Sequence, residues 1–214
     1  MTEFIFIRHG ETDFNRQQRF QGQVDVPLNA SGHAQAARLA QRLAHETVDG
    51  FVCSDLLRTR ETAAPLAVAW RMTPQLDKAF REQSFGVFEG LDVPTIKTRH
   101  ADLWAQWLEH RADFRLPQGE SLREFHARVL QAVRELARRH EMRKLAVVTH
   151  GGVLDMLWRT AHSLPLDGLR NCEIPNTGIN RLRWRDGALH ITSWADAEHL
   201  AGLPAQAGTA AGER

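Results

Sequence analysis

The chain has 214 residues, with 27 basic and 26 acidic side chains and a formal net charge of +1. This balance argues against a polyanion-binding surface, because nucleic-acid binders usually show a basic patch or stripe. We therefore expect no nucleic-acid partner. The two cysteines, Cys53 and Cys172, provide neither a disulfide framework nor a zinc ligand set, which suits a reducing cytosol.

The length and hydropathy of the chain point to one cytoplasmic domain. A chain of this size can bury a sizeable core. It holds no run of about 18 apolar residues, and its N-terminus is too short and too acidic for a signal-peptide core, so no membrane partner is expected. We predict a single domain over residues 1–200, with a small cap subregion at about 91–119. Residues 203–214 lack apolar periodicity and are expected to form a flexible tail.

Three apolar runs predict buried strands. They span residues 4–7, 50–53 and 145–148. Continuous apolar strands are typical of a sheet that helices cover on both faces. Two later strands are expected at 178–184 and 189–194, joined by a turn at Asp186-Gly187.

Helical stretches separate the predicted strands. The first follows Asn29 or Ser31, either of which can cap it. Its expected buried face consists of Ala37, Ala40, Leu43 and Ala44. The second is expected at about 57–70, where Pro65 suggests a kink or a late start.

Two further helices complete the pattern. Ser121 and Glu124 match a capping box at the start of the third helix. Its apolar stripe is expected to consist of Leu122, Phe125, Val129, Val133 and Leu136. The fourth begins after Gly151-Gly152. Alternating strands and helices predict an α/β fold, a three-layer α/β/α sandwich with a mostly parallel central sheet.

Cationic and imidazole side chains follow the predicted strands. Arg8-His9-Gly10 ends the first strand, His150-Gly151 follows the third, and Arg58 lies five residues beyond Cys53. Ligands of open α/β sheets bind outside the carboxyl ends of the strands, so we expect these groups to share one pocket. Arginine matches phosphate oxygens bidentately, and imidazole can attack phosphorus or exchange protons near neutral pH. The adjacent glycines would let backbone N–H groups approach a phosphate. The sequence therefore predicts a site for a small phosphorylated substrate or inorganic phosphate.

The motifs, taken in order, resemble those of the histidine phosphatase superfamily, the phosphoglycerate mutase-like proteins. They are RHGET (8–12) with Asn15, FQGQVDVPLN (20–29), CSDLLRTRETA (53–63), REQSFGVFEG (81–90), GES (119–121) and VTHGG (148–152). The resemblance covers roughly residues 3 to 194 and implies a phosphoglycerate mutase-like fold. No metal or other cofactor is expected, because the side chains already neutralise a phosphate and no metal-ligand spacing such as HExxH appears.

The resemblance also implies individual roles. His9 would be the nucleophile that becomes a phosphohistidine, and Glu82 would be the proton donor. Arg8, Arg58 and His150 would stabilise the transferring phosphoryl group. The expected phosphate- or substrate-binding positions are Gly10, Asn15, Gln21, Gly22 and Gly151. Two other carboxylates close in sequence, Glu11 and Glu89, compete with Glu82 for the acidic role.

Two alternatives concern particular segments. A cysteine phosphatase would need a C-x5-R motif, but Thr59 stands where that arginine belongs, so we interpret Cys53 as a small buried hydrophobe. Residues 101–114 predict a helix with Trp104, Trp107 and Leu108 on one face. That face could pack on the core or contact the organic part of the substrate.

Three functions fit the motifs. The stretch between Gly90 and Gly119 is short and the chain has no tyrosine, which departs from the basic, tyrosine-rich insertion of phosphoglycerate mutases. We therefore predict a metal-independent phosphomonoesterase acting on small phosphorylated metabolites. The alternatives are a cofactor-dependent phosphoglycerate mutase and a non-catalytic phosphate-binding or scaffold protein. A homodimer is left open.

Overall fold

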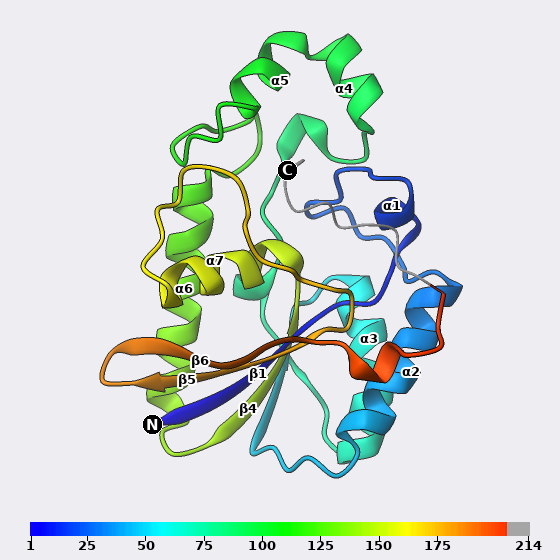
Figure 1. Cartoon of the computed structure of the whole chain (residues 1–214), viewed down its shortest axis with the longest axis vertical. Helices are drawn as coiled ribbons and strands as arrows, with labels where there is room; N and C mark the ends of the chain where they lie inside the picture. Colours follow the sequence, from blue (N-terminus) through cyan, green and yellow to red (C-terminus); the bar gives the residue numbers. More distant parts are fainter. Residues whose placement is uncertain (205–214) are drawn as a thin grey trace.

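The centre of the molecule is a six-stranded sheet in the order β3-β2-β4-β1-β5-β6 (Figure 1). The structure is a computed structural model and describes residues 1–204, so the tail expected at 203–214 lies outside the described residues from 205 onward. The strands are β1 (Thr2–Arg8), β2 (Gly50–Cys53), β3 (Gln75–Leu76), β4 (Lys144–Thr149), β5 (Ile179–Arg185) and β6 (Ala188–Asp196). The first four strands are parallel to one another, and β5 is antiparallel to both of its neighbours, β1 and β6, which confirms the predicted mostly parallel sheet.

Helices cover both faces of this sheet (Figure 1). They are α1 (Asp13–Arg16), α2 (Ala30–Leu43), α3 (Leu57–Trp70), α4 (Val93–Arg99), α5 (Ala101–Trp107), α6 (Leu122–Arg139) and α7 (Gly151–Ala161), with short 3₁₀ turns η1 (Lys78–Phe80), η2 (Gly86–Phe88) and η3 (Glu198–Leu200). Successive side chains of a strand point to opposite faces. Phe4 and Phe6 accordingly pack with α6 and α7, while Ile5 and Ile7 pack with α2 and α3.

The predicted start of α6 is confirmed, because Ser121 and Glu124 form both hydrogen bonds of the capping box. The α7 helix begins at Gly151 and so includes the two glycines that were expected to precede it. The α3 helix spans Leu57–Trp70, which confirms the predicted bounds. It contains Pro65, so the late start that this proline suggested was wrong. The hairpin turn lies at Asp186 and Gly187, whose φ angles of 52° and 81° are those of a type I′ turn.

The buried face of α2 differs from the expected one. Asn29 is the cap, and the buried apolar residues of the helix are Ala36, Leu39, Ala40 and Leu43. Ala37 and Ala44 are exposed, so their placement on this face was wrong. Alanine occurs on every side of this helix, and the two leucines determine which side is buried.

The chain leaves the sandwich between η1 and α6 and forms a cap, in which α4 and α5 lie far from the sheet (Figure 1). This region has its own small core of Phe88, Ile96 and Leu116, to which Phe20 contributes from outside it. The α5 helix ends at Trp107, and Leu108 is 48% exposed, so the expected three-residue face does not extend to Leu108. No helix in the described part of the chain is long and apolar enough to cross a membrane.

Candidate active site

His9 lies directly after β1 and is almost fully buried. Its Nδ1 is 2.7 Å from the carbonyl oxygen of Gly10. A carbonyl only accepts hydrogen bonds, so Nδ1 carries the proton and Nε2 holds a lone pair. Burial, followed by the charges of Arg58 and Arg8, lowers the pKa of His9 well below its ordinary value. The imidazole is therefore neutral and has a free nitrogen.

The backbone of His9 is held by a segment that precedes β5. The Asn176 Nδ2 donates to the His9 carbonyl at 2.9 Å, and the Thr177 N–H donates to the Arg8 carbonyl at 3.1 Å. Sequence reasoning missed both residues, because they belong to no recognised motif and lie far from His9 along the chain.

His150 lies beside His9 because β4 and β1 are neighbouring parallel strands. The two ring centroids are 5.3 Å apart, and the His150 Nε2 is 2.8 Å from the Ser54 Oγ. His150 is fully buried, and burial followed by the charge of Arg58 lowers its pKa well below the ordinary value. The predicted pairing of the two strand ends is thus present.

Two arginines flank these rings and line one pocket together with His9. Arg8 donates from Nη1 to the Ile174 carbonyl at 2.6 Å. Arg58 is fully buried and donates to the carbonyls of Val24 at 2.9 Å and Gly22 at 2.8 Å. Burial lowers the pKa of Arg58 to about 10, so the guanidinium stays charged at neutral pH. The pocket therefore presents two fixed cations beside the neutral imidazole of His9.

The loop after His9 supplies three more of the predicted residues. Asn15, Gln21 and Gly22 line the same pocket. Thr12 and Asn15 form a capping box at α1, and the Thr12 hydroxyl also donates to the Gln21 Oε1 at 2.9 Å. The buried Nδ2 of Asn15 has no hydrogen-bond acceptor within residues 1–204, so this donor is available to a ligand.

The glycines beside the two histidines make different contacts. The Gly10 N–H donates to the Thr62 Oγ1 at 2.9 Å, so the expected approach of this group to a phosphate was wrong. Position 10 has no room for a side chain, because Gly10 packs on α2 and an added Cβ would lie 2.7 Å from the Gly32 carbonyl oxygen. Gly151 does line the pocket, as expected.

Glu82 lies in the pocket at the N-terminus of α7. Its Oε2 accepts from the Gly152 N–H at 3.0 Å, and its Oε1 accepts from the Gln83 N–H at 2.9 Å. The competing carboxylates make structural contacts instead. Glu11 pairs with Arg16 at 2.9 Å, and Glu89 accepts from the Phe85 N–H at 2.9 Å. Among these carboxylates of the described chain, Glu82 lines the pocket.

The outer part of the pocket was not predicted in detail. Aromatic rings from the cap and from α6 line it, namely Phe85, Trp107, Phe114 and Phe125. Trp104 and Trp107 both pack against Phe20 and Phe88, as their grouping on one face predicted. Of the two, Trp107 also lines the pocket.

Cationic side chains also reach the outer pocket. An added Cβ at Gly151 would lie 3.4 Å from the Arg8 Nε and 3.7 Å from the Arg170 Nη1, so two guanidinium groups share this edge. Arg170 pairs with Asp155 at 3.8 Å, and Asp155 also pairs with Arg159 at 3.2 Å. One carboxylate therefore serves two arginines. Arg170 lies in a segment without periodicity, so no pattern marked it.

Cys53 is fully buried, and burial raises the pKa of its thiol to about 12. The thiol donates to the Ser54 carbonyl at 3.0 Å and does not line the pocket found in the described residues. The interpretation of Cys53 as a buried hydrophobe is confirmed.

Known proteins resemble this chain over nearly its whole length. A protein named "Probable phosphoglycerate mutase GpmB" from Serratia proteamaculans (strain 568) is 33% identical over 205 residues, which cover 94% of this chain and 95% of the relative. A solved structure of mycobacterial glucosyl-3-phosphoglycerate phosphatase Rv2419c with VO3 superposes with a TM-score of 0.78 at 27% identity, covering 90% of this chain and 98% of that one. A phosphoserine phosphatase mutant from Entamoeba histolytica, in complex with phosphoserine, gives a TM-score of 0.83 at 25% identity and covers 94% of this chain and 100% of that one.

The family of this chain is identified by a family model that matches most of the sequence. The model of the histidine phosphatase superfamily (branch 1) matches residues 4–197. This span contains His9 and His150 at adjacent strand ends, as well as Arg8, Arg58 and Glu82 around one pocket. The chain belongs to the histidine phosphatase superfamily, branch 1.

Proposed function

We propose that this protein is a metal-independent phosphomonoesterase that hydrolyses small phosphorylated metabolites through a phosphohistidine on His9. The observation that carries the proposal is the hydrogen bond from the His9 Nδ1 to the Gly10 carbonyl. It leaves the Nε2 lone pair free, in a buried place between two guanidinium groups. A neutral, oriented imidazole beside fixed cations suits in-line attack on phosphorus.

The first step transfers the phosphoryl group to the enzyme. The His9 Nε2 lone pair forms a bond to phosphorus while the bond from phosphorus to the ester oxygen breaks. Protonated Glu82 gives its proton to the departing alkoxide, which leaves as an alcohol. In the second step a water oxygen attacks the phosphoryl group and Glu82 takes a proton from that water. The N–P bond breaks, inorganic phosphate leaves, and both side chains return to their starting states.

The cations and the start of α7 stabilise the charge of the transferring group. Arg8 and Arg58 are held by backbone carbonyls, so little reorganisation is needed during the reaction. The N-terminus of α7, an 11-residue helix that begins at Gly151, adds a positive dipole end at the same edge. The buried Asn15 amide supplies a further donor.

The substrates we propose are small esters whose organic part carries its own anionic group. Arg170 lies next to Arg8 at the outer edge and is only partly neutralised by Asp155. Trp107 and Phe114 offer apolar surface on the remaining wall. The neighbouring solved structures named as phosphoserine and glucosyl-3-phosphoglycerate phosphatases support both the reaction and this substrate class.

A phosphoglycerate mutase is the second candidate, and the names of the sequence relatives favour it. A mutase would use the same His9 and return the phosphoryl group to a substrate in place of water. The short segment between Gly90 and Gly119 and the absence of tyrosine from the chain support the phosphatase. A non-catalytic scaffold fits poorly, because it has no need of His9, Arg8, Arg58 and Glu82 around one pocket with His150 packed behind His9.

The test is a panel of phosphomonoesters with 3-phosphoglycerate included, assayed with and without EDTA beside His9→Ala. We expect phosphate release that survives EDTA and is lost in the variant. Conversion to 2-phosphoglycerate with little phosphate release, stimulated by a bisphosphoglycerate, would assign the mutase. A folded protein that yields neither product would support the non-catalytic scaffold.

A further inference from the structure

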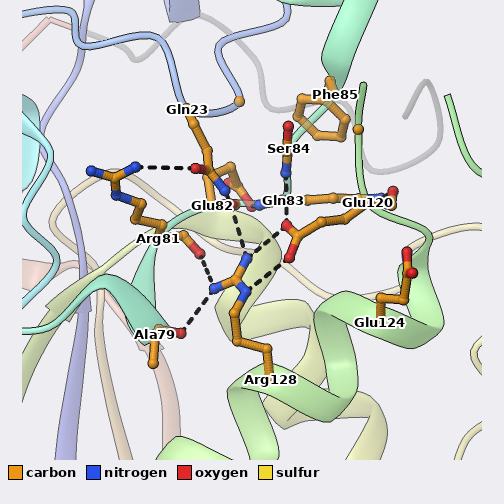
Figure 2. A network of polar contacts seen from close by, with 12 residues as sticks. Gln23, Ala79, Arg81, Glu82, Gln83, Ser84, Phe85, Glu120, Glu124 and Arg128 are labelled. Carbon is orange, nitrogen blue, oxygen red and sulfur yellow. Dashed lines mark hydrogen bonds and ion pairs between the residues drawn. The ribbon is translucent and has the colours of Figure 1, made fainter. Parts of the chain in front are cut away.

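Arg128 on α6 uses every N–H of its guanidinium in a hydrogen bond (Figure 2). Nη1 donates to the carbonyls of Ala79 at 2.9 Å and Arg81 at 3.1 Å, and Nη2 donates to the carbonyl of Glu82 at 3.3 Å. Nε and Nη2 hold the two carboxylate oxygens of Glu120 at 2.9 and 2.8 Å. Since arginine has five such donors, none is left over for a ligand.

Glu120 holds the residues that follow Glu82. Its Oε2 accepts from the Ser84 N–H at 3.0 Å, and its own N–H donates to the Ser84 carbonyl at 2.9 Å. Its carbonyl accepts from the Gln83 Nε2 at 2.9 Å. The bidentate pair of Arg128 and Glu120 therefore holds the backbone on both sides of Glu82 by hydrogen bonds.

The segment that this pair holds has no regular secondary structure. Residues 81–85 lie between η1 and η2 and belong to no helix or strand, so side chains must satisfy much of their backbone. Within residues 1–204, the Glu82 carboxylate accepts hydrogen bonds from the N–H groups of Gln83 and Gly152. Its place over α7 consequently depends on where the backbone of this segment is held.

Arg128 and Glu120 act from outside the pocket. Each side chain is 23% exposed, and neither belongs to the described residues that line the cavity, whereas Glu82 and Gln83 do. An ordinary surface ion pair contributes little to stability. This pair differs because it is bidentate and is shared with three carbonyls of one loop, a geometry that lysine cannot reproduce.

We propose that Arg128 and Glu120 are positioning residues that hold Glu82 where it can protonate the leaving group. The inference rests on the proposed function, since it assumes that Glu82 is the proton donor. It assigns a role in the reaction to two residues that touch no substrate.

The experiment compares kcat/KM for two esters in Arg128→Gln, Glu120→Gln and Glu82→Gln. Glycerol 3-phosphate has a strongly basic leaving group that needs a proton, whereas p-nitrophenyl phosphate has a weakly basic one that does not. We expect Arg128→Gln to lower kcat/KM for glycerol 3-phosphate roughly 10²-fold, the order of loss for a small misplacement of a reacting group. The value for p-nitrophenyl phosphate should change far less, and Glu120→Gln should follow the same pattern.

Three controls separate positioning from general stability. Arg134→Gln removes an exposed arginine from the same helix and should leave both esters unaffected. In the Glu82→Gln background, Arg128→Gln should cause no further loss, because the two changes act through one group. Arg128→Lys keeps the positive charge but cannot form the bidentate pair, so it should show the same loss as Arg128→Gln. It is also the test variant if Arg128→Gln does not fold.

The outcomes are distinct. Equal losses on both esters, or additive losses in the double variant, would overturn the positioning role. Wild-type activity in Arg128→Gln would also overturn it. If the wild-type protein hydrolyses neither ester, or if Glu82→Gln shows no leaving-group dependence, the proposed function fails and not this inference alone.

Discussion

The carboxylate of Glu82 lies against the backbone of Gly152, the second residue of α7. The Gly152 N–H donates to the Oε2 of Glu82 at 3.0 Å, and a Cβ on Gly152 would overlap the Oε1 of the same carboxylate. Gly152 thus both donates a hydrogen bond to the Glu82 carboxylate and leaves room for it. The second glycine of the VTHGG motif is therefore in close contact with Glu82.

Replacing this glycine should separate activity from stability. In Gly152→Ala the new methyl group pushes the Glu82 carboxylate away, and we expect kcat/KM for an alkyl phosphate to fall roughly 10²-fold. The free energy of unfolding should change by no more than about 1 kcal/mol, because the helix preference of alanine offsets the crowding of Glu82 and of the Phe125 ring 3.0 Å from the new Cβ. Steady-state kinetics and urea unfolding of the same preparation check both. Full activity in the variant would contradict the assigned contact.

Arg170 should control selectivity between substrates. Arg170→Gln should lower kcat/KM for 3-phosphoglycerate roughly 10- to 100-fold, the loss expected when a charged hydrogen-bond partner is removed. Glycerol 3-phosphate, which lacks the carboxylate, serves as the matched control and should change little. If both esters lose activity equally, Arg170 binds the phosphoryl group or supports the loop, and the proposed preference for a second anion is wrong.

The buried histidines should make the fold sensitive to acid. Burial lowers the pKa of His9 and of His150 in the folded state, below the ordinary value of 6.5. Below that pH the unfolded chain therefore binds more protons than the folded one, and stability falls as the pH falls. Each histidine adds about 1.4 kcal/mol per pH unit to this slope. Stability contributed by the neutral rings is fully present above about pH 6.5 and is lost progressively below it.

This slope can be measured by urea unfolding between about pH 7.5 and about pH 5.5. His150→Gln should reduce the slope by the contribution of one proton. His33→Gln changes an exposed histidine of α2 and is the matched control. An unchanged slope in His150→Gln would mean that His150 is not held neutral.

Cys53 should be dispensable for catalysis. Its thiol is buried and its pKa is raised to about 12, so the reactive thiolate is scarce at neutral pH. Cys53→Ala should keep kcat/KM and lose roughly 1 kcal/mol of stability, which is typical of a buried substitution. A loss of activity comparable to that of His9→Ala would revive the cysteine phosphatase mechanism.

The sequence predicted the inner site well because that site depends on strand ends. Continuous apolar runs identified β1, β2 and β4, and parallel strands bring their carboxyl ends to one edge. His9, His150 and Arg58 therefore met as expected. The face of α2 was misassigned because alanines give no contrast between its sides.

The residues of the outer pocket could not be predicted from sequence patterns, because loops determine their positions. Arg170 and Asn176 lie in an aperiodic stretch between α7 and β5, and their contacts with Asp155 and His9 join distant segments. Arg128 is another case. It lies between two residues of the predicted stripe of α6 and is an ordinary polar residue in the sequence pattern. Three of its five hydrogen bonds depend on where residues 79–82 pass in space, and the other two depend on the position of Glu120.

The central claim is that the phosphoryl group passes through His9. The most direct measurement is rapid mixing of the protein with substrate, quenching without acid, and mass spectrometry of the intact and digested protein. We predict one added phosphoryl group, acid-labile, located on His9 and absent from His9→Ala. Hydrolysis that proceeds with His9 unmodified, with the group on another residue, or undiminished in His9→Ala would contradict the account.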